Sequence, residues 1–561
     1  MLRCKNLTVR VAGGGPEILS DATAEFRPRA LNAVIGPSGC GKTTLVKAMM
    51  GIIPATGESF LQDQRIGDAE DLAGRVGFAP QFTTAHPQLT VEETFGAALD
   101  LAVRGAAEKK RRLEAVLDIT GLTAHRDKKV GALSGGQLRR LGLGVELTLD
   151  PSCMVCDEVT SGLDPNSETQ ILQLLQRLVR ERGKTFVCII HNLAKLDCFD
   201  WITVVHQGAV IFQGTLSQLL EYFGIPDALH LYDQMNAHDL AYWRERWAEF
   251  LANNPAHYNW YGTTAPASSV PLPLPKLPGM VSQLCTLLRR RFLLFFRDTG
   301  YFGLTMAITF GFPVIVVIFA IKGLPQVPEV PLDRVLASVD TFKQAVAVQM
   351  ERAHIASLLS GLVMFQVILL TLMGANNGGR EIAAERILYE KERLMGLRPG
   401  AYALSKIFFV SVIAMFQGLW MAGFVKTICQ FPGPWDMQLL TMAGVCVSMS
   451  IVCLGFSAIM QSAEKASLLS IYLVGFQIPL SGVVLALPEV LTWVCRPFIN
   501  AYWGWSGFMK SMQAERVYDA YMETGVMSSI VEPWTANSAL LVQAMVGIGL
   551  ILIGCYRRRP L

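Results

Sequence analysis

The segment Gly36–Thr43 (Gly-Pro-Ser-Gly-Cys-Gly-Lys-Thr) has the residue types and spacing of a loop that binds nucleotide phosphates. It follows the apolar run Leu31–Ile35, which predicts a strand, and precedes Thr44–Met50, which predicts a helix. Glycines let backbone N–H groups surround phosphates at a helix N-terminus. We expect Lys42 to reach the β- and γ-phosphates and the Thr43 hydroxyl to ligate Mg²⁺. The predicted ATP-binding residues are Gly36, Pro37, Ser38, Gly39, Cys40, Gly41, Lys42, Thr43 and Thr44.

Two carboxylates end a second apolar run, Ser152–Cys156, which predicts another buried strand. We expect Asp157 to hold Mg²⁺, directly or through water, and Glu158 to polarise an attacking water. One carboxylate could not serve both purposes, because a metal-bound oxygen is a poor base. The alternative, a solvated acidic pair at a strand end, is disfavoured by the phosphate-binding loop upstream. The predicted chemistry is hydrolysis of a nucleoside triphosphate.

A third segment, Leu133-Ser134-Gly135-Gly136-Gln137, opens a predicted helix that continues as Leu138–Leu143. Ser134 is a good N-cap, and the backbone N–H groups beside it make a second anion site. A protein that already has a phosphate-binding loop does not need a second such site for the same nucleotide. In isolation, the segment would be read as a capped helix with a flexible entry.

Together these segments resemble the ATP-binding cassette (ABC) family, in which the Leu133–Gln137 segment closes over the ATP held by the other protomer. By this resemblance Gln81 fits the Q-loop, which senses Mg²⁺ and contacts the membrane domain, and His191 fits the switch histidine. The D-loop would be Ser161, Gly162, Leu163 and Asp164. The implied catalytic residues are Glu158, His191 and Gln81, and the implied Mg²⁺ residues are Thr43, Gln81 and Asp157. The implied fold is an α/β P-loop nucleoside-triphosphatase, with a RecA-like core and a helical subdomain.

The subtype resembles the G subfamily (White or pleiotropic-drug-resistance type), in which the cassette precedes an ABC-2 type permease. Gly144–Leu147, Leu220–Pro226 and the loop Glu385–Arg393 carry this resemblance. The sequence departs from the subfamily at Gln137, where glutamate is usual, and at Val159, where proline is usual. No aromatic residue lies in Thr8–Ala12, where many cassettes stack one on adenine. These departures are typical of a distant member, such as a bacterial one.

The composition is that of a membrane protein with a polar part attached. Of 561 residues, 51% are hydrophobic and 17% charged, whereas soluble chains average about 25% charged. The net charge of +3 argues against a nucleic-acid partner. A membrane span needs roughly 20 apolar residues, and six runs without Asp, Glu, Lys or Arg follow residue 298: 299–321, 355–379, 407–425, 437–463, 466–488 and 533–556.

The expected domains are an ABC nucleotide-binding domain over 1–225, a linker over 226–278, an amphipathic connecting helix over 279–298 and an all-α, six-helix transmembrane domain over 299–561. Basic residues gather in 289–297, 380–406 and 557–559, and they share one side only if both termini are cytoplasmic. We therefore expect a multi-pass protein of the plasma or bacterial inner membrane. The stretch Met280–Phe296 would lie along the inner interface or simply begin the first span.

The chain has one P-loop and one Leu133–Gln137 segment, so by the resemblance it needs a second copy of itself or a related half-transporter. The implied function is ATP-driven export of an amphipathic small molecule such as a lipid, a sterol-like molecule or a drug. The alternative is a mechanotransmitter, or a heterodimer subunit, without its own cargo pathway. Candidate cavity residues are Phe365, Gln366, Phe476 and Gln477, which equally suit helix packing. The aromatic stretch Arg496–Met512 would be an outward lid or an interfacial belt.

Twelve cysteines do not form an evident framework. Cys153 and Cys156 have metal-ligand spacing, but they lie within an apolar strand and lack a second pair, which disfavours zinc. Cys429 and Cys495 fall in predicted outward loops, where either a disulfide or two free thiols is compatible with the sequence.

Overall fold

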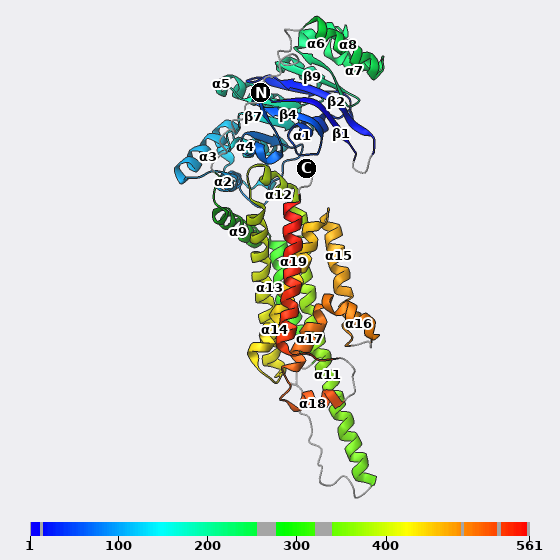
Figure 1. The fold of residues 1–561 in the computed structure, drawn as a ribbon. Coiled ribbons are helices and arrows are strands. Elements are labelled where there is room, and N and C mark those ends of the chain that lie inside the picture. The colour runs from blue at the N-terminus through cyan, green and yellow to red at the C-terminus, as the bar shows by residue number, and fades with distance from the viewer. Residues whose placement is uncertain are drawn as a thin grey trace. The chain divides into compact units, whose positions relative to one another are not determined.

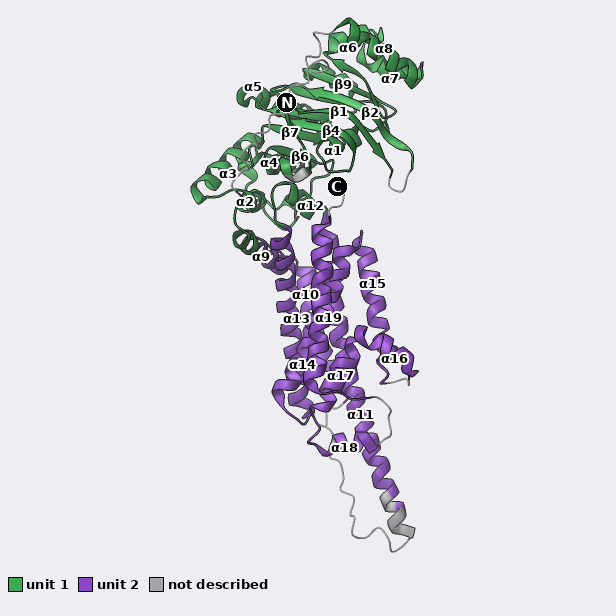
Figure 2. Ribbon diagram, in the orientation of Figure 1, with its two compact units in different colours: residues 1–286, 387–398, 559–561 green, residues 287–386, 399–558 purple. Residues whose placement is uncertain are grey.

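The computed structural model describes residues 2–11, 15–254, 277–319, 339–483, 487–523 and 529–557. The chain forms two compact units (Figure 2). The first unit comprises Met1–Thr286, Ile387–Arg398 and Arg559–Leu561, and the second comprises Leu287–Arg386 and Pro399–Arg558. A short segment from the C-terminal half of the sequence, 387–398, is therefore part of the unit that the N-terminal half builds.

A six-stranded sheet in the order β10-β9-β3-β8-β7-β6 forms the centre of the first unit. All neighbouring strands in this sheet are parallel except β10, which is antiparallel to β9. The strands β3, β7, β8, β9 and β10 are buried along their whole length, as expected when both faces of a sheet are covered. The bounds are β3 (Leu31–Ile35), β6 (Val76–Ala79), β7 (Cys153–Asp157), β8 (Thr185–Ile189), β9 (Trp201–His206) and β10 (Ala209–Gly214).

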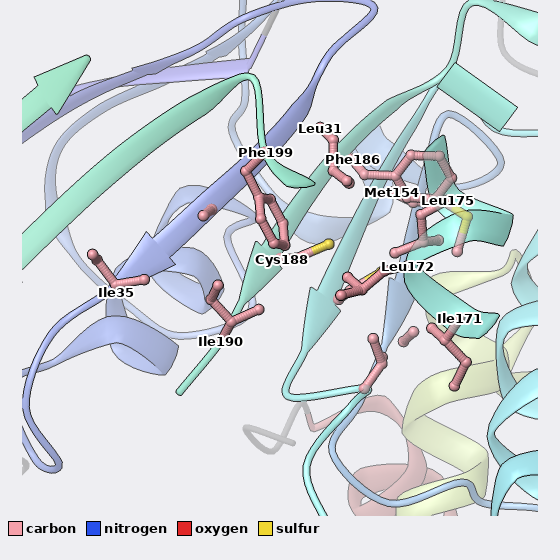
Figure 3. Close-up of a cluster of buried hydrophobic side chains, with 14 of the residues drawn as sticks. Leu31, Ile35, Met154, Ile171, Leu172, Leu175, Phe186, Cys188, Ile190 and Phe199 are labelled. Atoms are coloured by element: carbon pink, nitrogen blue, oxygen red, sulfur yellow. The ribbon is translucent and has the colours of Figure 1, made fainter. Parts of the chain in front are cut away.

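A second, antiparallel sheet in the order β2-β1-β4-β5 covers one side of this core. Its strands are β1 (Leu2–Arg10), β2 (Glu17–Phe26), β4 (Thr56–Leu61) and β5 (Gln64–Arg65). Helix α1 (Lys42–Met49) buries Leu45 and Met49 in a cluster to which both sheets contribute. Helix α5 (Pro165–Arg182) packs Leu172 and Leu175 beside Phe186 of the large sheet in a separate cluster (Figure 3).

Six further helices complete the N-terminal part of this unit: α2 (Val91–Ala102), α3 (Ala106–Thr120), α4 (Gly135–Leu147), α6 (Leu216–Phe223), α7 (Leu231–Asn236) and α8 (Leu240–Asn253). The last two occupy much of the segment that the sequence suggests as a linker. They pack because Trp243 and Trp247 are buried against the core cluster that includes Phe212 and Phe223. The proline-rich end of that expected linker, 255–276, lies outside the described residues.

The second unit is helical. Its elements are α9 (Met280–Arg297, shared with the first unit), α10 (Thr299–Ile318), α11 (Val339–Gly378), α13 (Pro399–Cys429), α14 (Trp435–Ile459), α15 (Ala463–Gly475), α16 (Glu489–Cys495), α17 (Asn500–Lys510), α18 (Arg516–Glu523) and α19 (Pro533–Tyr556). Among the described residues, five segments are long and apolar enough to cross a membrane. They are Thr299–Ile318, Val346–Leu394, Pro399–Cys429, Trp435–Ile459 and Pro533–Tyr556.

Close helix approach in this unit depends on small residues. A Cβ atom added at Gly378 of α11 would lie 2.1 Å from the carbonyl oxygen of Ser450 in α14. One added at Gly554 of α19 would lie 2.5 Å from the carbonyl oxygen of Ala458, also in α14. Small residues that let backbones approach are the usual basis of helix association in membranes. Helix α14 is therefore central to the packing of the second unit.

Two elements differ from the sequence expectation. Residues 466–488, expected as one span, form the 13-residue helix α15 and a short 3₁₀ turn at Pro479–Ser481. Helix α15 ends at Gly475, and the chain beyond it contains Pro479, which cannot donate a helical hydrogen bond, and Gly482, which has a φ of +74°. Helix α11 begins at Val339 rather than Ile355, and it extends beyond the neighbouring helices of its unit (Figure 1). The preceding part of the expected loop, 322–338, lies outside the described residues.

Candidate functional site

The turn between β3 and α1 has the backbone shape of a phosphate-binding loop. A Cβ atom at Gly36 would lie 2.1 Å from the carbonyl oxygen of Val205, so only glycine fits. Gly41 precedes α1 with a φ of +102° and supplies no side-chain cap. The first N–H groups of α1 therefore have no side-chain acceptor at the N-cap and are suited to bind an anion.

The two side chains expected to act on the phosphates and the metal lie at this turn. Lys42 Nζ donates to the carbonyl oxygens of Gly36, at 2.8 Å, and Pro37, at 3.0 Å. The Thr43 hydroxyl donates to Asp157 Oδ1 at 3.0 Å. Burial raises the pKa of Asp157, and the hydrogen bond from Thr43 acts in the opposite direction. A hydroxyl and a carboxylate in contact are oxygen donors of the kind that Mg²⁺ prefers.

The three predicted catalytic residues meet at the carboxyl ends of neighbouring strands. Gln81 follows β6, Glu158 follows β7 and His191 follows β8. Gln81 Nε2 donates to Glu158 Oε2 at 2.8 Å, and His191 Nε2 lies 2.6 Å from Glu158 Oε1. Glu158 has a φ of +52°, a conformation that non-glycine residues adopt rarely and that is concentrated at functional sites. A carboxylate held between an amide and an imidazole is well placed to orient and deprotonate a water.

The Leu133–Gln137 segment forms a capped helix start. The Ser134 hydroxyl accepts from the backbone N–H of Gln137 at 3.4 Å, and Gln137 Oε1 accepts from the N–H of Ser134 at 3.1 Å. Gln137 thus completes a capping box, a role that glutamine and glutamate share. A Cβ atom at Gly136 would lie 2.8 Å from Ser167 Oγ, so this turn packs on the start of α5. The other subfamily departure, Val159, is buried in the core.

The expected D-loop leads into α5. Asp164 is the N-cap of that helix and accepts from the backbone N–H groups of Asn166, at 3.1 Å, and Ser167, at 3.0 Å. The hydrogen bonds from Ser167 lower the pKa of Asp164. Arg139 of α4 donates to the carbonyl oxygen of Ser161 at 3.4 Å. This hydrogen bond joins the D-loop to α4, the helix that begins within the Leu133–Gln137 segment.

The first unit also contains a buried ion pair that the sequence analysis did not predict. Lys391 Nζ is 3.0 Å from Glu146 Oε1, and the two side chains are 2% and 3% exposed. Lys391 belongs to helix α12 (Arg386–Leu394), and Glu146 to α4. Glu146 Oε2 also accepts from the backbone N–H of Phe78 in β6 at 3.2 Å. The sequence feature that points to this contact is Glu146, a charged residue between apolar ones (Gly-Val-Glu146-Leu), because a buried charge needs a partner.

A buried glutamine joins the same segment to the start of α9. Gln283 Nε2 donates to the carbonyl oxygens of Leu101, at 2.8 Å, and Gly396, at 3.0 Å. Its Oε1 accepts from the N–H of Arg398 at 3.1 Å. The expected amphipathic stretch is thus one helix, α9, whose first turn is fixed to residues 396–398.

The four candidate cavity residues have different surroundings in the second unit. Gln366 and Gln477 are buried, and Gln477 Oε1 accepts from the backbone N–H of Ala501 at 3.0 Å. Phe365 packs edge to face on Phe319 with ring centres 5.9 Å apart. Phe476 is 56% exposed. The two glutamines pack within the unit, whereas Phe476 is available to a ligand, a lipid or a second chain.

The cysteines considered for metal or disulfide chemistry are free thiols. Cys153 and Cys156 are buried, and burial raises the pKa of Cys153 to about 12. Among the described residues no group of three or more metal-ligating side chains gathers. Cys429 and Cys495 are also unpaired within the chain.

The fold and the cluster define a P-loop nucleotide-binding cassette, followed by a helical unit with candidate membrane spans. Residues 19–161 match the ABC transporter family, and residues 282–512 match the ABC-2 type transporter family. The chain belongs to the ABC transporter family and is an integral membrane protein. The predicted fold class, with its cassette first and membrane domain second, is confirmed.

Three relatives illustrate this membership. The ABC transporter ATP-binding/permease protein Rv1747 of Mycobacterium tuberculosis is 27% identical over 519 residues, which are 88% of this chain and 55% of that protein. ABC transporter G family member 26 of Arabidopsis thaliana is 34% identical over 220 residues, 37% of this chain and 32% of that protein. The energy-coupling factor transporter ATP-binding protein EcfA1 of Thermotoga maritima is 34% identical over 210 residues, 37% of this chain and 80% of that protein. The chain spans about half the length of the first relative and a third of the second.

Proposed function

We propose that this chain is an ATP-driven half-transporter of the G type, which acts as a dimer and exports a hydrophobic or amphipathic molecule. The observation that carries the proposal is the cluster Gln81–Glu158–His191 at the ends of three parallel strands, beside the phosphate-binding turn. Glu158 acts as the base for the attacking water, and Gln81 and His191 fix its orientation. The proposal includes four domains: the nucleotide-binding domain over 1–225, the linker over 226–278, the connecting helix over 279–298 and the transmembrane domain over 299–561.

Mg²⁺, when bound, would supply positive charge that offsets the negative charge of the ATP phosphates. Thr43 and Asp157 would hold the ion, with Gln81 nearby on Glu158. Lys42 would leave the carbonyl oxygens of Gly36 and Pro37 for the phosphates, since the ammonium group is attracted more strongly to the highly charged triphosphate. The residues around the turn therefore suit a magnesium–ATP complex.

The surroundings of the Leu133–Gln137 turn support a dimer. Gly135 and Gly136 face Leu163 and Ser167 of their own chain. A second copy would supply its Leu133–Gln137 turn to the phosphates held by the first, which gives two equivalent sites. A related half-transporter could take the place of the second copy. Both termini on the cytoplasmic side agree with the basic residues in 289–297 and 380–406.

The ion pair Lys391–Glu146 supports coupling between hydrolysis and the membrane helices. Residues 387–398 are inserted between the segments that form α11 and α13, yet they belong to the cassette's unit. Glu146 joins Lys391, the helix that begins after Ser134 and the strand that precedes Gln81. A shift of α4 or β6 on ATP binding would therefore move α12, which is continuous in sequence with the membrane domain.

Substrate-stimulated ATPase activity tests whether cargo passes through the membrane domain. The chain in nanodiscs would be titrated with lipids, sterols and amphipathic drugs, beside Phe365→Trp and Phe476→Trp. If the chain is an exporter, a compound that stimulates the ATPase activity of the parent should not stimulate either variant. The control variant Phe416→Trp, at an exposed position, should still be stimulated. A mechanotransmitter predicts stimulation that is absent from the whole panel or unchanged by the substitutions.

A further inference from the structure

The carbonyl oxygen of Gly36, the first residue of the phosphate-binding turn, accepts two hydrogen bonds. One comes from Lys42 Nζ at 2.8 Å, and the other comes from the hydroxyl of Tyr232 at 3.2 Å. Tyr232 lies in α7, nearly two hundred residues further along the chain and outside every cassette motif in the sequence. Helix α7 therefore touches the turn directly.

The position of Tyr232 is fixed by its neighbours in the first unit. Leu231 and Met235 of α7 are fully buried. Trp243 Nε1 of α8 donates to the carbonyl oxygen of Met235 at 3.1 Å, and Trp243 is itself fully buried. Helix α7 is thus attached to the core at both ends. Burial raises the pKa of Tyr232, so its hydroxyl stays protonated and remains a donor.

The two donors to Gly36 differ once phosphates are present. Lys42 is attracted to the phosphates, and a movement of its ammonium group toward them would weaken its hydrogen bond to the Gly36 carbonyl. A carbonyl group left without a donor in this partly buried place is unfavourable. The Tyr232 hydroxyl can remain, because Tyr232 has no part in binding phosphate. It holds the turn in the same shape before and after Lys42 moves.

We propose that Tyr232 is a positioning residue for the phosphate-binding turn, through which helix α7 sets the affinity of the cassette for ATP. The inference rests on the ATP-binding part of the proposed function. It concerns neither hydrolysis nor cargo. Removal of the hydroxyl should raise the dissociation constant and the KM for ATP, with kcat nearly unchanged.

The chain offers a matched control in α6, the α-helix that precedes α7 in the sequence. Tyr222 of α6 is buried, and its hydroxyl has no hydrogen-bond partner among the described residues. Tyr232→Phe and Tyr222→Phe therefore make the same chemical change at two half-buried or buried rings, and only the first removes a bond to the turn.

The test is equilibrium binding of ATP with Mg²⁺ to the full chain in nanodiscs, in a Glu158→Gln background that prevents turnover. Y232F should weaken binding by about three- to tenfold, whereas Y222F should leave it within about twofold. Melting temperatures of both variants serve as the folding control. Equal binding by Y232F and the parent would overturn the inference, whereas failure of the parent itself to bind ATP would refute the proposed function instead.

Hydrogen–deuterium exchange gives a second readout that needs no activity. With ATP bound, the peptide that covers 36–43 should exchange faster in Y232F than in Y222F. The same exchange in both variants would show that the hydroxyl does not hold the turn, and it would contradict the inference.

Discussion

His191 Nε2 lies 2.6 Å from Glu158 Oε1, although 33 residues separate them in the sequence. The two residues follow neighbouring parallel strands, β7 and β8, which are in register over Cys153–Asp157. The opposite oxygen of Glu158 is bonded to Gln81 after the next strand, β6. The parallel order of β6, β7 and β8 therefore brings the proposed base and its two proposed orienting groups together.

Glu158→Gln should abolish hydrolysis while ATP binding persists. The amide is nearly the same size but is a very poor base, so kcat should fall by about 10²–10⁴. Glu181→Gln on the exposed end of α5 is the control, because it makes the same change away from the site. Retention of more than a tenth of the parent turnover by Glu158→Gln would rule out this role for Glu158.

Lys391→Met should destabilise the protein, because Glu146 would remain buried without its cation. Loss of one partner of a buried ion pair costs about 3–5 kcal/mol, whereas loss of both is often close to neutral. The double variant Glu146→Gln with Lys391→Met should thus recover thermal stability. If coupling depends on the pair, the double variant will still lack substrate-stimulated ATPase activity. Recovery of both properties would give the pair a structural role only.

Two inactive chains should restore activity when they are mixed. Lys42→Ala removes the ammonium group that is proposed to bind phosphate, and Ser134→Ala removes the hydroxyl that caps the Leu133–Gln137 turn. In a mixed dimer one composite site would keep both Lys42 and Ser134, so turnover should return to a fraction of the parent rate. ATPase activity of co-reconstituted chains measures this. A mixture as inactive as either chain alone would argue that each site is built within one copy.

Alkylation of Cys40 should be slow at neutral pH and speed up as the pH rises. Cys40 is 7% exposed, and burial raises the pKa of its thiol, so little reactive thiolate is present near pH 7. ATP should protect the thiol further, because Cys40 lies within the phosphate-binding turn. Maleimide labelling followed by mass spectrometry, with the exposed Cys285 as the internal reference, reports both effects. Labelling of Cys40 as fast as that of Cys285 at pH 7 would contradict the expectation.

The sequence predicts that Gln81, Glu158 and His191 follow strands, and the structure brings these three side chains together. Runs such as Leu31–Ile35 and Cys153–Asp157 are mostly apolar and buried along their whole length, and parallel strands bring the residues that follow them to one edge of the sheet. Gln137 shows that a departure from a family pattern can preserve the physical role, here the capping box.

The contacts that the sequence does not predict are long-range ones between elements without a motif. Lys391–Glu146 joins residues 245 positions apart, and Tyr232–Gly36 joins residues 196 apart. No local periodicity encodes such pairs. The end of α15 could have been predicted from the sequence. Pro479 and Gly482 indicate a turn within residues 466–488, but the absence of charged residues favoured a single span there.

The most direct test of the central claim is the ATPase activity of the purified chain alone in nanodiscs, with the number of copies per particle measured by mass photometry. We predict steady turnover from particles that contain two copies, with none in Glu158→Gln particles of the same size. Turnover by single copies, or no turnover from well-folded two-copy particles, would contradict a homodimeric ATP-driven transporter.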